Sequence, residues 1–262
     1  MSIKKFIYHL FLDFKRILKK TIKISAYFHF FKAKKRTRLI IEIEHGGLGD
    51  NLFFSHIPRI AKIFGGYDEV LYSTFSKMRN KEHLTFCWLS NPYLDGFTDA
   101  PGQLVRKNID DYSTGNILDK IMYAYKLNDG LTNHKPEIYF KIKKNRDLKN
   151  SIIFDPNWIT DLYDRHIIEN KVKEYFDVNN IKVDYILPPK NVSFKSLNFS
   201  AIYLDRNFSE YCRAIISCKE FYCFASGSAV LAEALGKKAT VFYSDKVSNV
   251  FLFSKSHNYV KI

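Results

Sequence analysis

The sequence predicts an α/β fold in which two doubly wound domains face each other across a cleft, preceded by a basic amphipathic helix. Short apolar runs alternate with stretches of helical period from residue 39 onward, the pattern of strands alternating with helices. Glycine-bearing turns follow apolar runs at residues 46–49 and again at residues 226–228. Ligands bind at such turns in open α/β sheets, so both domains are expected to contribute one turn to the cleft.

The first turn lies within residues 39–62, where an apolar run ends in Gly46, Gly47 and Gly49 and a helix follows. The glycines allow a sharp turn and a close approach of the backbone to a ligand. Unpaired amides at the helix start favour an anionic or hydroxyl-rich ligand. Asp50 adds a carboxylate and Asn51 an amide beside it, although an Asp in this place can also act only as a helix cap. The spacing matches neither a P-loop nor the dinucleotide fingerprint.

The remaining elements follow from periodicity and from turn residues. Strands are expected at residues 69–73, 151–154, 183–187, 201–204, 220–224 and 239–243, and an extended segment at 137–142. Helices are expected at residues 117–125, 164–176, 208–217 and 229–235. The polar run 143–150 marks a boundary. We therefore expect a segment 1–38, an acceptor domain 39–147 and a donor domain 148–262.

Positive charge is concentrated at the N-terminus. The chain of 262 residues has a net charge of +14, and residues 1–38 hold 12 Lys/Arg against the single acid Asp13. Apolar residues there recur at three- and four-residue steps, which predicts an amphipathic helix. Such a helix suits an anionic membrane surface, with packing on the protein body and nucleic-acid binding as alternatives. It is too interrupted by charge to span a bilayer. The near-neutral remainder of the chain argues against nucleic acid as a partner.

The second turn, Ser226-Gly227-Ser228, follows a buried strand and opens an alanine-rich helix. Two hydroxyls and the helix amides would form a cradle for a diphosphate, and an ordinary capped helix is the alternative. Asn157 follows the first strand of the second half, and Glu233 lies on the helix; both are further candidates for donor binding. His45 and His56 flank the first turn and are expected to be structural.

Four cysteines, Cys87, Cys212, Cys218 and Cys223, form no Cys-x-x-Cys pair and no cluster with histidine. Neither zinc nor a disulfide framework is expected. The last three lie among apolar residues and are predicted to be small core residues, which fits a cytoplasmic setting.

Three segments resemble the heptosyltransferase family of glycosyltransferases (glycosyltransferase family 9), which has two Rossmann-like domains in the GT-B architecture. They are residues 46–52 with Ser55 and 58–62, the Asn91-Pro92-Tyr93-Leu94-Asp95 stretch, and Ser226-Gly227 through Ala232, Ala234, Leu235 and Gly236. The family usually has Asp and His at the positions of Ala225 and Val230. The present chain is also short for the family.

The resemblance implies an inverting transfer in which Asp50 is the general base and the 226–228 turn holds the donor diphosphate. It implies a nucleotide-sugar as co-substrate, with no other cofactor and no metal. The expected acceptor is a lipid-linked or surface glycan, such as lipopolysaccharide, lipooligosaccharide or capsule. The enzyme is then expected to be peripheral on the cytoplasmic face of the membrane. A non-catalytic member that binds a glycan or a protein is the alternative, motivated by Ala225 and Val230.

Overall fold

The first half of the chain contains a small parallel sheet. A computed structural model describes residues 38–109, 111–158, 165–188, 199–203 and 207–262. Strands β1 (Arg38–Ile41), β2 (Glu69–Ser73) and β3 (Gly96–Thr98) pair in the order β1-β2-β3, all parallel. A parallel bridge between Ile41 and Gln103 adds a further segment on the free side of β1. In chain order the strands of this layer are therefore 3-2-1-4: successive strands are added on one side of β1 and then on its other side, and all remain parallel.

The second half forms a larger parallel sheet of six strands. These are β4 (Ile152–Asp155), β5 (Val183–Ile186), β6 (Phe199–Ile202), β7 (Glu220–Phe224), β8 (Thr240–Tyr243) and β9 (Asn258–Lys261). They run in the order β6-β5-β4-β7-β8-β9. In chain order this is 3-2-1-4-5-6, the doubly wound order of dinucleotide-binding folds. The strand order reverses between β4 and β7, which is where such sheets bind ligands.

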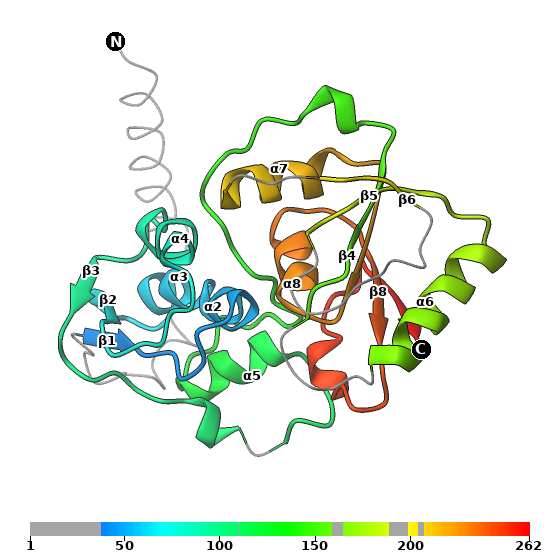
Figure 1. The fold of residues 1–262 in the computed structure, drawn as a ribbon. Helices are drawn as coiled ribbons and strands as arrows, with labels where there is room; N and C mark the ends of the chain where they lie inside the picture. The colour runs from blue at the N-terminus through cyan, green and yellow to red at the C-terminus, as the bar shows by residue number, and fades with distance from the viewer. Residues whose placement is uncertain (1–37, 110, 159–164, 189–198, 204–206) are drawn as a thin grey trace, which may run out of the picture. The chain divides into compact units, whose positions relative to one another are not determined.

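Helices connect the strands, as Figure 1 shows. They are α2 (Leu48–Phe54), α3 (Ile57–Ile63), α4 (Lys81–His83), α5 (Ile117–Ala124), α6 (Arg165–Val178), α7 (Phe208–Ser217) and α8 (Gly227–Ala234). A π-helical turn η1 (Leu84–Leu89) and the 3-10 turns η2 (Arg106–Asn108), η3 (Arg146–Leu148) and η4 (Asn249–Phe251) complete the list. No helix in these described ranges is long and apolar enough to cross a membrane.

The α/β prediction is confirmed, and β2, α7 and β7 have the expected bounds residue for residue. Two strands were missed. β3 has three residues, too few to show a period, and β9 is a half-exposed edge strand with two polar ends. Residues 137–142 were expected to be extended, and they form no regular element. The expected N-terminal helix lies outside the described residues.

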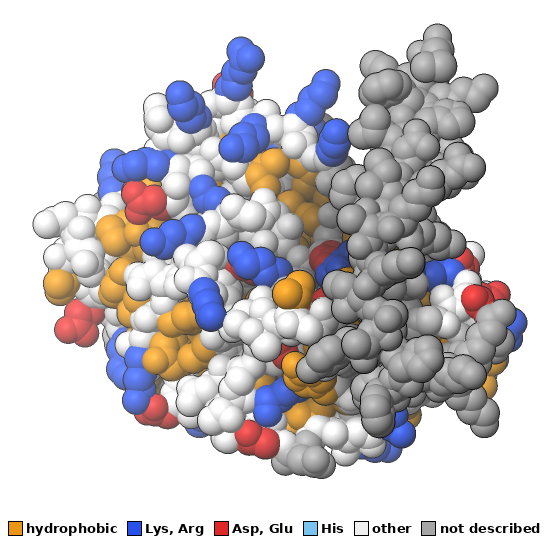
Figure 2. Space-filling model, turned by 180° about the vertical axis from the view of Figure 1, so that it is seen from behind, with side chains coloured by type: hydrophobic (Ala, Val, Ile, Leu, Met, Phe, Trp, Pro, Cys, Tyr) orange, Lys and Arg blue, Asp and Glu red, His pale blue; other side chains and the backbone are white. Residues whose placement is uncertain are grey.

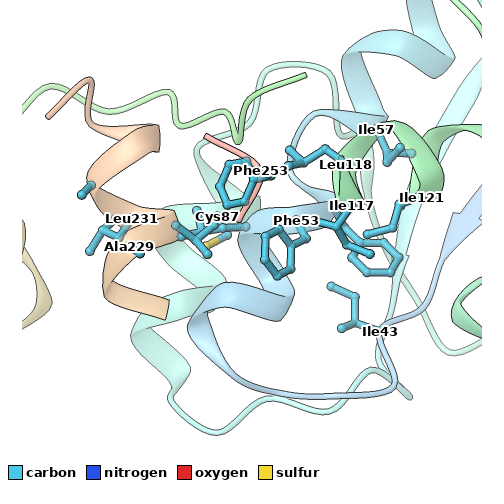
Figure 3. Close-up of a cluster of buried hydrophobic side chains, with 14 of the residues drawn as sticks. Ile43, Phe53, Ile57, Cys87, Ile117, Leu118, Ile121, Ala229, Leu231 and Phe253 are labelled. Carbon is cyan, nitrogen blue, oxygen red and sulfur yellow. The ribbon is translucent and has the colours of Figure 1, made fainter. Parts of the chain in front are cut away.

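A continuous core joins the two halves of the described chain. Figure 3 shows Phe53 and Ile57 of the first half in one cluster with Ala229, Leu231 and Phe253 of the second. The ring of Phe53 packs edge-on against Phe253 with centroids 5.5 Å apart. The cleft expected between two domains is not confirmed, and the boundary near residue 148 remains a prediction. All four cysteines are buried, which confirms the core prediction made for Cys212, Cys218 and Cys223.

His56 is fully buried between α2 and α3, as a structural histidine would be. Its Nε2 donates to the carbonyl of Leu118 at 3.1 Å, and its Nδ1 has no partner in the described part of the chain. Burial, followed by the nearby charge of His134, lowers the pKa of His56 to about 3. A second ring proton would also be a buried donor without an acceptor.

This burial predicts an acid-sensitive contribution to stability. The pKa is lower in the folded state than the usual 6.5, so the unfolded chain takes up the proton first as the pH falls. The free energy of unfolding should therefore fall between about pH 6.5 and 4, and His56→Gln should remove part of that fall. Urea titrations at pH 7 and pH 5 test this. An equal pH dependence in both proteins would contradict it.

Candidate active site

Asp50 lies in the first turn of α2, at the carboxyl end of β1. One carboxylate oxygen accepts from the backbone N–H of Gly47 at 3.1 Å, which closes a cap at the start of the helix. The other accepts from the Arg106 guanidinium at 2.7 Å. Both side chains are mostly buried, with 22% and 16% of their surface exposed. The carboxylate is therefore both a helix cap and half of an ion pair.

Arg106 was missed by the sequence analysis. It follows directly on the segment that bridges β1 at Gln103, so the strand reversal of the first sheet brings it to Asp50. Its Nε is buried without a partner in the described part of the chain. No motif marks this arginine, and only a predicted strand at residue 103 could have pointed to it.

The rest of the glycine turn is held by contacts with neighbouring backbone and with a buried side chain. A Cβ on Gly46 would lie 2.9 Å from backbone atoms of Lys77 and Met78, so only glycine fits there without a shift. Asn51 is fully buried: its carbonyl accepts from the Trp88 indole at 2.8 Å and its amide donates to Gly47 at 2.9 Å. Asn51, predicted as an acceptor-loop residue, thus holds the shape of the loop from inside.

The two glycine turns meet. A Cβ on Gly227 would lie 3.0 Å from the Gly49 nitrogen, and one on Gly49 would lie 3.3 Å from the Gly227 Cα. The same Cβ on Gly49 would be 3.5 Å from the side chain of Val230, which is buried. Val230, in place of the usual histidine of the resembled family, therefore packs where the N-terminal ends of α2 and α8 touch.

Gly227→Ala should accordingly loosen this contact. The added methyl would sit tighter against the Gly49 nitrogen than nearly all real Cβ atoms do, and backbone cannot yield as a side chain can. We expect the free energy of unfolding to drop by about 1–3 kcal/mol. Chemical denaturation measures it. As a control, Gly130→Ala has no atom near the added methyl, although its positive φ also costs stability. A smaller loss at Gly227 than at Gly130 would contradict the tight contact.

A second polar cluster lies at the carboxyl end of β4, beside the strand reversal of the large sheet. Asp155 is 1% exposed, and one carboxylate oxygen accepts from the Tyr211 hydroxyl at 2.7 Å and from the Ser228 hydroxyl. The other oxygen accepts from the backbone and side-chain amides of Asn157, at 2.9 and 2.7 Å. Burial, and then the negative charge of Asp155, raise the pKa of Tyr211 well above its usual value. The phenol therefore keeps its proton and acts as a donor.

Asp155 also helps to hold the second turn, Ser226-Gly227-Ser228, in place through hydrogen bonds. Ser226 caps α8 by accepting from the Ser228 amide at 3.3 Å, and the Ser228 hydroxyl is bonded to both Asp155 and Tyr211. Asn157 reaches across to the carbonyl of Pro188 at 3.0 Å. The structure thus brings Asn157 and the 226–228 turn together, with a buried carboxylate beneath them. The sequence analysis ended the expected strand at residue 154 and did not single out Asp155, which is the last residue of β4.

Glu233, the last predicted donor residue, is engaged elsewhere. Its carboxylate accepts from Ser254 at 2.6 Å and from Ser256, and it pairs with Lys135 at 2.6 Å. Its side chain is 2% exposed. These partners attach the C-terminal segment to α8. They give Glu233 a structural role, and none of these contacts is with the other candidate residues.

Comparison with solved structures relates this fold to known proteins, while no protein-family model and no curated protein matches the sequence. A glycosyl transferase family 9 protein from Veillonella parvula is 11% identical with a TM-score of 0.54, over 87% of this chain and 86% of that one. The ADP-heptose lipopolysaccharide heptosyltransferase II of E. coli is 11% identical with a TM-score of 0.53, over 86% and 90%. TibC from enterotoxigenic E. coli is 13% identical with a TM-score of 0.61, over 87% of this chain but 63% of TibC.

One expectation needs correction. TibC is described as an iron-containing glycosyltransferase, so absence of a metal cannot be carried over from the resemblance, and the metal-free prediction was wrong in that respect. Within the described ranges, no three His, Cys, Asp or Glu residues lie together as a metal site would need. The described residues therefore do not fit such a metal.

The identities of 11–14% relate these proteins through their fold. The resemblance to family 9 glycosyltransferases is thus confirmed for this chain at the level of its fold.

Proposed function

We propose that the protein is an inverting glycosyltransferase that moves a sugar from a nucleotide-sugar to a cell-surface glycan. The observation that carries the proposal is the meeting of the two turns: Asp50 and the start of α8 come from different sheets and are joined through Gly49 and Gly227. A base and a diphosphate cradle on opposite sides of one site are what a single displacement requires. The family 9 fold supports the same assignment.

In this proposal Asp50 takes the proton of the acceptor hydroxyl while the oxygen of that hydroxyl bonds to the sugar carbon. The bond between that carbon and the donor phosphate breaks, and a nucleoside diphosphate leaves. Amides at the start of α8 stabilise the charge on the leaving group. Arg106, bonded to Asp50 at 2.7 Å, orients the carboxylate until the acceptor hydroxyl approaches.

The donor is proposed to be a nucleoside diphosphate sugar. One TibC structure was determined with ADP-D-β-D-heptose, and the E. coli neighbour is named for ADP-heptose and lipopolysaccharide. Lipopolysaccharide, lipooligosaccharide or capsule is the acceptor class, and heptosyl or hexosyl transfer is the reaction. Val230 at the contact with α2 favours a donor other than ADP-heptose, because a histidine there is usual in the resembled family.

A thermal-shift screen tests the donor. A ligand present at a hundred times its Kd should raise the melting temperature by about 5–10 °C. The probes are ADP, GDP, UDP and CMP with their sugar conjugates, and the matching nucleosides without phosphate are controls. A shift with one diphosphate but not its nucleoside supports the transferase. The absence of any shift counts against it.

A non-catalytic binding protein is the second candidate. It is favoured by the hydrogen bonds already present: both oxygens of Asp50 have partners, and the Ser228 hydroxyl is bonded to Asp155. The buried carboxylate of Asp155 also competes with a diphosphate for the positive end of α8. Transfer from any nucleotide-sugar would eliminate this candidate, whereas glycan binding without transfer would support it.

Residues 1–38 are proposed to hold the protein peripherally at the cytoplasmic face of the membrane, where such acceptors are assembled. Each basic residue near an anionic surface contributes roughly 1 kcal/mol. Replacing Lys15, Arg16, Lys19 and Lys20 with Gln in the full chain should therefore weaken binding to phosphatidylglycerol vesicles by at least about tenfold. Sedimentation with vesicles measures this. Unchanged binding would discard the proposed role.

A further inference from the structure

A cavity of about 400 Å³ lies away from the candidate active site. Residues of three segments line it: 144–146 with 149, 216–218, and 235–237. They lead into β4, β7 and β8, which are neighbours in the large sheet. Parallel strands start at one edge, so the cavity lies at the amino edge of the sheet. Asp155 lies at the opposite edge, roughly 10–15 Å away for strands of this length.

The lining of this basic cavity carries four cations, Lys144, Arg146, Lys149 and Lys237, and no Asp or Glu. Two acids lie near these segments in the sequence, Asp147 and Glu220. Neither lines the cavity, and Glu220 is paired with Lys219 at 3.2 Å. Figure 2 shows Lys and Arg side chains gathered along the upper edge of the molecule seen from behind. In Figure 1 the same upper edge carries the green turn η3.

One of these four cations, Lys237, already has hydrogen-bond partners near the end of a helix. Lys237 donates to the backbone carbonyls of Cys218 and Lys219 just beyond the end of α7, as a lysine at a helix C-terminus often does. The side chains of Lys144, Arg146 and Lys149 make no hydrogen bond or ion pair to any residue that the structure describes. Three positive charges therefore face the cavity without a compensating group.

The segment that carries these charges is held in place. The Asn145 side chain caps η3 by accepting from the backbone N–H of Asp147 at 3.0 Å, and the backbone N–H of Asn145 donates to the Ser217 hydroxyl of α7 at 2.7 Å. Ile216 and Leu235 add apolar surface to the lining. The volume lies within the range of small-molecule sites. The cavity thus has an anchored wall, an apolar part and a cationic rim.

We propose that the basic cavity binds a phosphate-bearing ligand at a site separate from the candidate active site. Phosphate and diphosphate groups offer several acceptor oxygens and more than one negative charge, which matches three uncompensated cations on one lining better than a single carboxylate does. The phosphate can belong to a soluble molecule or to a lipid headgroup. The proposal stands whether or not the protein transfers sugar.

The test uses the full-length protein and three variants. The cavity variant is Lys144→Gln/Arg146→Gln/Lys149→Gln. The control variant, Lys81→Gln/Lys126→Gln/Lys171→Gln, removes the same charge from exposed sites that do not line the cavity. A single Lys144→Glu variant reverses one rim charge. Melting temperatures establish that all three are folded; the replaced side chains are exposed, so little change is expected.

Two probes separate the sources of phosphate. Isothermal titration with inorganic pyrophosphate reports a soluble ligand, and sedimentation with phosphatidylcholine vesicles, with or without phosphatidylglycerol, reports a lipid headgroup. We expect the cavity variant to bind at least about tenfold more weakly than the control variant with one of the probes, and Lys144→Glu to show a loss with the same probe. Loss with pyrophosphate identifies a soluble ligand, and loss with anionic vesicles alone identifies a headgroup. Equal binding by the cavity and control variants with both probes overturns the proposal, as does a wild-type protein that binds neither.

Discussion

Asp50→Asn is expected to lower the turnover of sugar transfer by roughly 10²- to 10⁴-fold, the usual contribution of a general base. The amide oxygen of asparagine can still accept from the Gly47 N–H, so the cap at the start of α2 is retained. The amide cannot take a proton from the acceptor hydroxyl. Initial rates with the donor identified by thermal shift measure the change.

The same substitution also affects stability, and the two effects must be separated. Arg106 loses a charged partner at a site where 16% of its side chain is exposed, which costs about 1–3 kcal/mol of unfolding free energy. Asp95→Asn is a matched control. Asp95 also accepts from a backbone amide, that of Val70 at 2.6 Å, and also pairs with a cation, Lys62 at 2.6 Å. It lies directly before β3 and beside the start of β2, rather than in the glycine turn.

We expect Asp95→Asn to keep its turnover and Asp50→Asn to lose it at temperatures where both proteins are folded. Full turnover by a folded Asp50→Asn protein would remove Asp50 from the chemistry and leave it as a cap. Equal losses in both variants would point to a general effect of stability. Arg106→Gln adds a further measurement, because an arginine that orients the carboxylate should affect kcat more than KM.

The sequence was informative where a pattern is local. Gly46, Gly49 and Asp50 lie within five residues, and the steric need for glycine at position 46 shows in the sequence as a glycine-rich turn. The Ser226-Gly227-Ser228 turn indicated a nearby helix start, since serine is a preferred N-cap, although the helix was expected from residue 229 and α8 begins at Gly227. Periodicity was sufficient for α7 and β7, whose bounds were predicted residue for residue.

It was uninformative where the site depends on distant contacts. Arg106 reaches Asp50 across 56 positions, and Ser228 reaches Asp155 across 73. Such pairs are set by strand order, which one sequence does not specify. Glu233 shows the converse: its place on a helix indicated a solvated or ligand-facing carboxylate, and packing of the C-terminal segment buried it instead.

Asp155→Ala is expected to lower the free energy of unfolding by about 3–5 kcal/mol, the largest loss of stability that we expect from a single substitution. Asp155 is fully buried and accepts four hydrogen bonds, from Tyr211, from Ser228 and twice from Asn157. Removing the carboxylate leaves several donors without an acceptor in a place that water cannot easily reach. Each such donor costs about 1–3 kcal/mol, partly offset because the buried charge is removed as well.

Tyr211→Phe provides the matched comparison, because it removes one donor and leaves the carboxylate with three. We expect a loss of about 0.5–1.5 kcal/mol for this variant. Urea denaturation of the single variants and of the double variant gives the coupling between the two side chains. A coupling above about 0.5 kcal/mol is expected for side chains in direct contact. An Asp155→Ala protein within about 1 kcal/mol of wild type would show that the carboxylate is dispensable for folding. The role of the carboxylate at the start of α8 would then lie in ligand binding. The thermal shift with nucleoside diphosphates measures this on the same variant.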